Sequence, residues 1–482
     1  MSSTPLRYYA SLNEQPGDDP DDVLFNSLYG VRTVEVNRPK KLNSLNPSMV
    51  RKILPRLREW EKSQMANVIM LTGAGGKALC AGGDVAQLAK QNGTKEGQKA
   101  SADFFGLEYI LDHLIATYSK PYIAVMDGIT MGGGVGLSVH APFRIATEKT
   151  TFAMPETTIG FFPDVGGSFF LSRLDGEVGT YLALTSERLM GVQAMYAGIA
   201  THYLDSSVLQ PLTTRLSELN FRDHATRAER NDLINSTIAE FTTELPSPDS
   251  YEKSKNGNIS GELREAVDRC FRFNTIAEIL EALRTEAQGE GRIAEWAQAT
   301  VKTIAKRSPT SLKVTLKQLR LGKRWTISET FVREHQMAAR FMEHPDFTEG
   351  VSALLINKPA TQPNWKPALL EEVADEEVDK FFTLPEGLEP MEFLESLPGS
   401  TSDYHDYPHA IYGLPRESVV EAVVRNIGRN GEKAVLKEVL NQCGNKVGAK
   451  EKVQDVLRRK TEKQGDGIVW KKQQQQQQRA SL

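Results

Sequence analysis

An acidic side chain in apolar surroundings is the first feature of this sequence that could carry chemistry. Glu156 directly follows a Met-Pro pair, and residues 159–162 add three more large apolar side chains. Burial among such neighbours disfavours the carboxylate, so it raises the pKa of the acid and makes it a stronger base. Glu156 is therefore a candidate general base, although an acid after proline, taken alone, fits a helix N-terminus better.

Two glycine clusters could supply hydrogen-bond donors to the same site. Residues 73–84 read Gly-Ala-Gly-Gly-Lys-Ala-Leu-Cys-Ala-Gly-Gly-Asp, and residues 127–136 read Asp-Gly-Ile-Thr-Met-Gly-Gly-Gly-Val-Gly. Because glycine has no Cβ, a ligand can approach its backbone N–H closely, and two such groups, one at a helix N-terminus, form an oxyanion hole. A glycine run can also mark only a tight helix–sheet contact. The two clusters together with Met-Pro-Glu nevertheless favour a site.

Apolar runs precede both glycine clusters. Residues 68–71 and 122–126 are short and wholly apolar, which is typical of strands covered on both faces. Further strands are expected at residues 31–37, 144–147 and 151–154. Helices are expected over residues 101–117 and from Pro47, which follows the cap residue Asn46. Strands alternating with helices predict a mostly parallel α/β sheet whose strand ends carry the site.

The remainder of the chain is expected to be mainly helical. Helical patterns cover residues 179–200, 204–241, 263–287, 291–306 and 308–342, and shorter ones cover 418–424, 432–440 and 453–459. Residues 246–261 are expected to be a polar linker, and the acid-rich residues 371–406 to be loosely ordered. Residues 473–478 are six glutamines, a low-complexity run expected to be disordered.

Composition excludes several classes of protein. The chain has 482 residues and a formal net charge of −4, so no overall basic field recruits nucleic acid or an anionic membrane. Its longest uncharged apolar-to-small stretch, residues 128–139, is too short to cross a bilayer, and no membrane partner is expected. The three cysteines are far apart and odd in number, which argues against a disulfide framework and fits a reducing compartment. No metal site is expected from the cysteines or the eight histidines.

The ordered motifs resemble the crotonase, or enoyl-CoA hydratase/isomerase, superfamily, and most closely its 3-hydroxyisobutyryl-CoA hydrolase branch. The similarity is carried by residues 128–140, by Phe-Ala-Met-Pro-Glu-Thr at 152–157 and by Gly-Phe-Phe-Pro-Asp-Val-Gly-Gly at 160–167. It continues in residues 308–313, 344–351 and 365–367, and it runs from about residue 29 to about residue 373. The resemblance implies a crotonase-like ββα spiral core, followed by a helical C-terminal region and a basic tail.

The resemblance also implies roles for individual residues. The N–H groups of Gly83 and Gly133 would form the oxyanion hole for the thioester carbonyl of an acyl-CoA. Glu156 would activate water or attack the thioester to give a transient anhydride. Glu108 and Asp164 would contact the acyl end and its hydroxyl group. No metal or redox cofactor is implied, because CoA is part of the substrate.

One departure from the family pattern bears on the reaction. In hydratases of this superfamily a second glutamate stands where this sequence has Gly136. Its absence argues against hydration of a double bond and favours the hydrolase branch. The implied reaction is hydrolysis of 3-hydroxyisobutyryl-CoA in mitochondrial valine breakdown, with location in the matrix. A hydrolase acting on another acyl-CoA stays open.

The alternative function is structural. A homologue of this hydrolase branch is a component of the small subunit of fungal mitochondrial ribosomes. Beyond the resemblance, residues 415–482 hold 15 Lys and Arg against 8 Asp and Glu, a local net charge of +7. Such a tail could neutralise phosphates and dock on ribosomal RNA or proteins, or it could be only a solvated, disordered segment.

Four segments are expected from these observations. They are a disordered N-terminus or presequence remnant at 1–28, an acyl-CoA domain at 29–245, a helical part at 262–384 and an extension at 385–482. Within the first, residues 1–13 lack acids and contain Ser, Thr and one Arg. That composition suits a mitochondrial presequence and a disordered terminus about equally.

Overall fold

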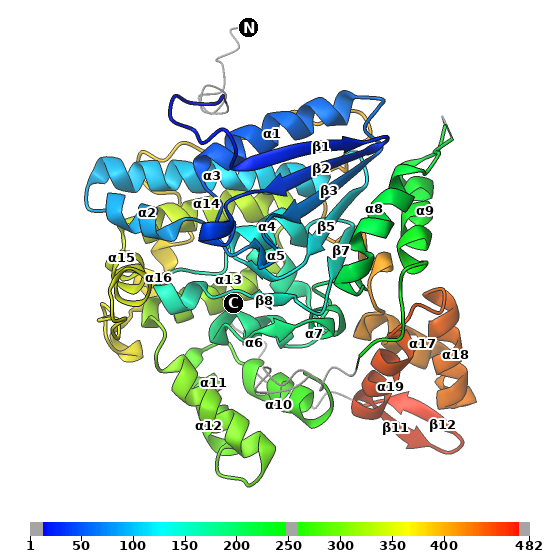
Figure 1. Cartoon of the computed structure of the whole chain (residues 1–482). Coiled ribbons are helices and arrows are strands. Elements are labelled where there is room, and N and C mark those ends of the chain that lie inside the picture. Colours follow the sequence, from blue (N-terminus) through cyan, green and yellow to red (C-terminus); the bar gives the residue numbers. More distant parts are fainter. Residues whose placement is uncertain (1–12, 223, 247–258, 472–482) are drawn as a thin grey trace, which may run out of the picture.

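The computed structural model describes residues 13–222, 224–246 and 259–471 (Figure 1). The expectations for a presequence, for most of the 246–261 linker and for the glutamine run fall outside these residues. Within them, no helix combines the length and the hydrophobicity needed to cross a bilayer.

A six-stranded sheet lies at the centre of the N-terminal half. Its strands are β1 (Val23–Leu28), β2 (Val31–Val36), β3 (Val68–Gly73), β5 (Tyr122–Met126), β7 (Phe143–Ala146) and β10 (His202–Tyr203). They follow the order β1-β2-β3-β5-β7-β10, and only the β1–β2 pair is antiparallel. The central strands β3 and β5 are apolar along their length because both faces are covered. The expected parallel α/β sheet is confirmed.

A second, smaller sheet carries the glycine clusters. Its strands are β4 (Ala78–Cys80), β6 (Ile129–Met131), β8 (Thr151–Ala153) and β9 (Leu189–Met190), in the order β4-β6-β8-β9. The first three are parallel, and each follows a strand of the large sheet after a short turn. This repetition is the expected ββα spiral. β9 interrupts the helical pattern expected over residues 179–200 because it completes the edge of this sheet against β8.

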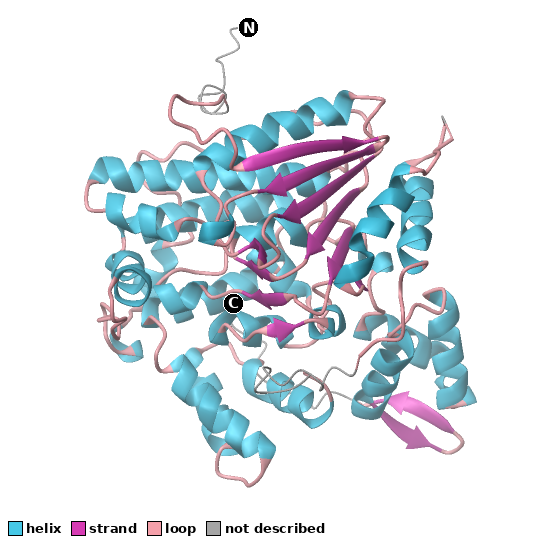
Figure 2. Ribbon diagram, in the orientation of Figure 1, coloured by secondary structure: helices cyan, strands magenta, loops and turns pink. Residues whose placement is uncertain are grey.

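Helices cover both faces of the large sheet (Figure 2). They are α1 (Pro47–Lys62), α2 (Val85–Gln91), α3 (Lys95–Thr117), α4 (Gly133–Val139), α5 (Gly167–Phe170), α6 (Val178–Thr185), α7 (Val192–Tyr196), α8 (Leu209–Ser217) and α9 (Arg227–Ala239). α1, α3 and α4 share one hydrophobic core, and α8 and α9 close a second one on the opposite face. The Asn46 side chain caps α1 by accepting the Met49 amide at 2.8 Å, as expected.

Seven further helices follow the spiral. They are α10 (Gly261–Phe271), α11 (Ile276–Glu286), α12 (Arg292–Ile304), α13 (Pro309–Gly322), α14 (Ile327–Glu343), α15 (Pro345–Val351) and α16 (Asp375–Lys380). α14 packs along α3, where the Tyr109 and Phe331 rings lie 6.1 Å apart. The C-terminal helical part therefore backs the helix that carries Glu108.

Residues 415–471 form a compact unit of their own. It contains α17 (Glu417–Ile427), α18 (Glu432–Gln442) and α19 (Ala449–Lys460), and the hairpin β11 (Thr461–Gln464) and β12 (Gly467–Trp470). Apolar side chains from all three helices and the hairpin form a separate core. The alternative expectation of a disordered tail is therefore wrong for these residues.

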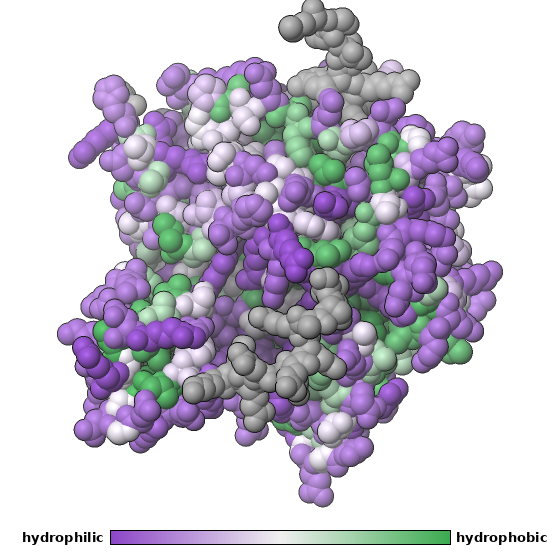
Figure 3. All heavy atoms as spheres, turned by 180° about the vertical axis from the view of Figure 1, so that it is seen from behind, coloured by the Kyte–Doolittle hydropathy of each residue, from purple (hydrophilic) through white to green (hydrophobic). Residues whose placement is uncertain are grey.

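Viewed from behind, the molecular surface is mostly hydrophilic, with separate hydrophobic patches (Figure 3).

Two other boundaries differ from expectation. β1 joins the large sheet through β2, so the folded part includes Val23–Leu28, which was expected to be disordered. Residues 371–406 contain α16 and lie against the body: the Thr401 amide donates to the Thr117 carbonyl at 2.9 Å, and the Ile327 amide donates to the Tyr404 carbonyl at 3.0 Å. An acid-rich sequence has little local preference, so tertiary contacts order this segment.

Candidate active site

The two glycine clusters meet at the ends of neighbouring strands. Gly82 follows β4 and Gly132 follows β6, and these strands are parallel and paired. The backbones approach so closely that a Cβ on Gly132 would lie 3.3 Å from the Cα of Gly82. The structure thus brings together the clusters that the sequence analysis singled out.

Gly83 and Gly133 present backbone amides at this junction. Gly133 is the first residue of α4, so its N–H lies at the N-terminus of a helix. Neither amide has an acceptor in the part of the chain that the structure describes. Two unoccupied N–H groups on adjacent glycine turns form the donor pair that an oxyanion hole requires.

Two glutamates flank these amides. Oε1 of Glu156 lies 3.2 Å from the Cβ position of Gly132, and Oε1 of Glu108 lies 2.4 Å from that of Gly133. Any side chain at 133 would collide with Glu108, so only glycine allows this approach. Glu108 and Glu156 are buried, and Oε1 of the first and Oε2 of the second have no hydrogen-bond partner among the described residues.

Asp164 completes an acidic triad with the two glutamates. It is buried, and its Oδ2 accepts a 2.8 Å hydrogen bond from the Tyr109 hydroxyl. Burial raises the pKa of Asp164 to about 7. Burial, followed by the charge of Asp164, raises the pKa values of Glu108 and Glu156 well above the ordinary range. Burial and mutual repulsion therefore make the three carboxylates stronger proton acceptors than free carboxylates.

Glu334, which the sequence analysis missed, holds the loop that carries Asp164. Glu334 lies on α14, and its carboxylate accepts hydrogen bonds from the backbone amides of Gly166 at 2.7 Å and Ser168 at 2.8 Å. Val165, the residue between Asp164 and Gly166, has a positive φ of 53°. Burial raises the pKa of Glu334 to about 8. Nothing in the local sequence of α14 indicated this contact, which spans 166 residues.

Asp112 was also missed, although a signal existed. It lies four residues after Glu108 on α3, which places both acids on one helix face. Its Oδ2 lies 2.5 Å from the Cβ position of Gly136, and neither carboxyl oxygen has a hydrogen-bond partner among the described residues. Burial, followed by the charge of Glu108, raises the pKa of Asp112 well above its usual value. Asp112 thus occupies the space that a side chain at position 136 would need.

A cavity of about 720 Å³ opens along α3, near the acidic triad, although none of the three acids lines it. Its walls include Phe104 and Leu107 of α3, and the Phe104 ring lies 3.8 Å from the Cβ position of Gly83. Lys95 and Lys99 line it as well, together with residues 385–389. Phe104 therefore separates the cavity from Gly83, and the charged side chains that line the cavity include acids as well as cations. The volume of the cavity suits a sizeable ligand.

Three other sequence features have no place in the site. Asp84 pairs with Arg38 at 3.0 Å and Lys41 at 2.8 Å. The Ser138 hydroxyl is buried and donates to the Gly134 carbonyl at 2.8 Å, so it is engaged within α4. The described residues contain no group of three or more His, Cys, Asp or Glu side chains arranged to hold a metal ion.

Comparisons with known proteins agree with this geometry. A model of the enoyl-CoA hydratase/isomerase family matches residues 31–382. The chain is 54% identical to small ribosomal subunit protein mS47 of Neurospora crassa, over 95% of this chain and 89% of that protein. It is 46% identical to the mitochondrial 3-hydroxyisobutyryl-CoA hydrolase of Rattus norvegicus, over 72% of this chain and 85% of that protein.

The fold is shared with solved structures. A carnitinyl-CoA dehydratase from Mycobacterium thermoresistibile aligns with a TM-score of 0.64 and 34% identity, over 77% of this chain and 99% of that one. An enoyl-CoA hydratase from Rhodobacter sphaeroides aligns with the same TM-score, 31% identity and equal coverage of this chain. From the ββα spiral, the paired glycine turns and these matches, the chain belongs to the enoyl-CoA hydratase/isomerase, or crotonase, family.

Proposed function

We propose that this protein hydrolyses the thioester of 3-hydroxyisobutyryl-CoA to 3-hydroxyisobutyrate and CoA, in mitochondria. The observation that carries the proposal is the unpartnered Glu156 carboxylate beside two unoccupied glycine amides. Relatives that bear this activity in their names are 46% and 42% identical in Rattus norvegicus and Homo sapiens. The lack of room at Gly136 for a second glutamate supports hydrolysis over hydration.

Each group has a defined part in this reaction. The thioester carbonyl oxygen accepts hydrogen bonds from the Gly83 and Gly133 amides, which stabilise the negative charge that develops on it. Glu156 takes a proton from water, which attacks the carbonyl carbon, or attacks that carbon itself to form an anhydride that water then opens. The carbon–sulfur bond breaks, and the thiolate leaves as CoA.

The substrate hydroxyl would be recognised by buried carboxyl groups. Glu108 and Asp164 are both buried, and the Tyr109 hydroxyl orients Asp164 by donating a hydrogen bond to it. A buried acceptor left without its hydroxyl partner is costly, so analogues that lack the hydroxyl should react poorly. Neither a metal nor a redox cofactor has a part in these steps.

The test measures free-thiol release from 3-hydroxyisobutyryl-CoA and from isobutyryl-CoA, which lacks the hydroxyl. We expect Glu156→Gln to lower kcat at least 100-fold, the usual contribution of a general base, while the protein stays folded. Glu432→Gln, at an exposed position of α18, is the matched control and should retain full activity. Full turnover by Glu156→Gln would reject the assigned role, and equal rates on both thioesters would reject the assigned substrate.

A second function is supported by a relative whose similarity extends over nearly the whole chain. The match to the Neurospora crassa ribosomal protein covers 95% of the chain, so it includes most of residues 415–471. A ribosomal protein of the same name from Schizosaccharomyces pombe is 41% identical over 76% of the chain. We infer that the chain also joins the mitochondrial small ribosomal subunit, with the C-terminal unit as a contact to ribosomal RNA or protein.

Exposed cationic side chains of the C-terminal unit can be tested as contacts to ribosomal RNA or protein. Arg429, Lys433 and Lys437 are exposed and have no ion-pair partner among the described residues. Replacing all three with Gln should abolish cosedimentation with mitochondrial small subunits and leave thiol release intact. Unchanged cosedimentation of this variant would reject the C-terminal unit's cationic face as the contact.

A further inference from the structure

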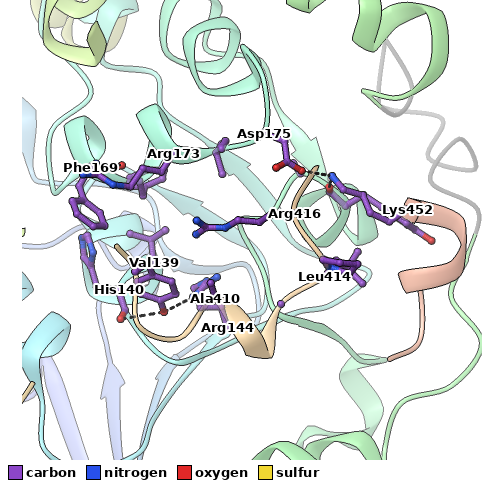
Figure 4. A pocket seen from close by; sticks show the side chains of 18 residues that line it. Val139, His140, Arg144, Phe169, Arg173, Asp175, Ala410, Leu414, Arg416 and Lys452 are labelled. Carbon is purple, nitrogen blue, oxygen red and sulfur yellow. Dashed lines mark hydrogen bonds and ion pairs between the residues drawn. The ribbon is translucent and has the colours of Figure 1, made fainter. Parts of the chain in front are cut away.

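A cationic pocket lies where the C-terminal unit meets the crotonase body. It has a volume of about 70 Å³, the space of about two waters. Its walls come from the body through Arg144 on β7 and Arg173 beside α5, and from the C-terminal unit through Arg416 and Lys452 (Figure 4). This pocket is separate from the cavity along α3, with which it shares no lining residue.

The charges in the pocket do not balance. Four cationic side chains line it, and Asp175 is the single acid among the lining residues. That acid is engaged already, because Lys452 contacts it at 2.9 Å and the Glu417 amide donates to it at 3.0 Å. His140 adds no charge, since burial lowers its pKa to about 4. Asp406 also acts on Arg173 without lining the pocket, so about two positive charges are left in excess, an arrangement that an anion would neutralise.

Neutral partners hold the two body arginines in place. Arg173 donates to the carbonyls of residues 169, 322, 323, 325 and 405, so its N–H groups are occupied, and it contributes charge alone. Arg144 donates to the carbonyls of Ala141 and Ile199 and to the Tyr407 hydroxyl, through Nη1 and Nε. Its Nη2 has no partner among the described residues. Burial, opposed by the charge of Asp406, lowers the pKa of Arg173 to about 10.

Arg416 is the unengaged member of this group. Among the described residues, its guanidinium group makes neither a hydrogen bond nor an ion pair, so all five N–H donors are available. Figure 4 shows its side chain extending into the middle of the pocket. A half-buried arginine held among three other cations without an acceptor indicates that the acceptor is a bound group.

We propose that this pocket binds one phosphate group, held by Arg416 and by the free Nη2 of Arg144, with Arg173 and Lys452 supplying charge. Arginine forks match the geometry of tetrahedral oxyanions, and a dianion suits the excess charge better than a monoanion such as chloride. The bound group bridges the crotonase body and the C-terminal unit, so its binding strengthens the attachment of the unit. Inorganic phosphate and the end of a phosphomonoester share this chemistry.

Calorimetric titration of the full-length protein with inorganic phosphate and with methyl phosphate tests the proposal, at constant ionic strength set with chloride. We expect one saturable site in the wild type. Arg416→Gln should weaken phosphate binding at least tenfold, and Arg416→Lys should weaken it less. Arg425→Gln, at an exposed arginine of the same unit, should bind phosphate as the wild type does. If the binding of both ligands depends on Arg416, the pocket is a site for phosphomonoesters. If only the binding of inorganic phosphate depends on Arg416, the pocket is a site for the free anion.

Thermal unfolding separates this role from a structural one. Arg416 has no protein partner and faces like charges, so Arg416→Gln should unfold in chloride at the wild-type temperature or above it. The same variant should lose the rise in Tm that phosphate gives the wild type. A structural role for Arg416 predicts a lower Tm in chloride. Two results would overturn the proposal. One is a lower Tm of Arg416→Gln in chloride together with unchanged phosphate binding, and the other is a wild type that shows no saturable phosphate binding.

Discussion

Two neighbouring arginines of α19 should differ sharply in their effect on stability. The Arg459 side chain is 2% exposed and contacts Glu417 and Asp455, each at 2.7 Å. The Arg458 side chain is 71% exposed and contacts Asp455 at 2.8 Å. We expect Arg459→Met to destabilise the folded C-terminal unit by about 3 kcal/mol, because both acids belong to that unit, and Arg458→Met to cost less than about 0.5 kcal/mol.

The magnitude follows from what each substitution leaves behind. Removing one partner of a buried pair costs about 3–5 kcal/mol because the other charge is left in a poorly solvated place. Glu417 keeps Arg264 at 3.2 Å and Lys460 at 3.8 Å, so the lower end of that range applies. About 3 kcal/mol corresponds to a roughly 150-fold shift in the equilibrium between the folded and unfolded states of the unit.

Limited proteolysis combined with mass spectrometry is the assay. If unfolding of the unit is fast and reversible, cleavage within residues 415–471 follows the unfolded population and rises by a similar factor in Arg459→Met. Arg458→Met is the matched control, with the same residue type, the same replacement and the adjacent position. Equal cleavage rates for the two variants would refute the argument that the buried ion pairs of Arg459 stabilise the unit.

Two more predictions follow from the buried acids. Gly136→Glu should destabilise the fold by about 2–3 kcal/mol, within the usual range for overpacking, because its Cβ would lie 2.5 Å from Asp112 Oδ2. Urea unfolding should show that the double variant with Asp112→Gly recovers stability. A single variant as stable as the wild type would contradict the steric argument. Burial raises the pKa of Asp268, but the charges of Arg264 and Lys460 outweigh burial and lower it to about 2. The ionised Asp268 side chain therefore stabilises the folded protein above the pKa of an unfolded aspartate, near 4. This stabilisation is lost as the pH falls from about 4 to about 2. Pepsin cleavage should then release the C-terminal unit over that interval, and Asp268→Asn should remove this pH dependence.

Much of the catalytic core could be predicted from local sequence. The wholly apolar runs of β3 and β5 specify buried strands, because a segment without a polar face must be covered on both sides. Glycine clusters after such strands, and Met-Pro-Glu after β8, then placed Glu156, Gly83 and Gly133 at one edge of the small sheet. Their catalytic roles came from the resemblance to a family and stay predictions.

The periodicity of residues 418–459 likewise predicted α17, α18 and α19, but their charge was misjudged. A run of Arg458, Arg459 and Lys460 looks uniformly basic and solvent-exposed in the sequence. In the structure Arg459 is buried and Lys460 contacts Asp268 at 2.8 Å. Helical periodicity alone shows which face is apolar. It gives no sign that Arg459 pairs with Glu417, or that Lys460 pairs with Asp268, 192 residues away.

The sequence by itself determined the buried strands β3 and β5, the glycine turns and the acid that follows β8, because each depends on neighbours within a few residues. Only the tertiary structure decided the surroundings of the site. It set Asp112 against Gly136, Tyr109 on Asp164 and Glu334 under the loop of Gly166. The physical reason is that burial and charge pairing depend on which segments pack together, and those segments lie up to 168 residues apart in this chain.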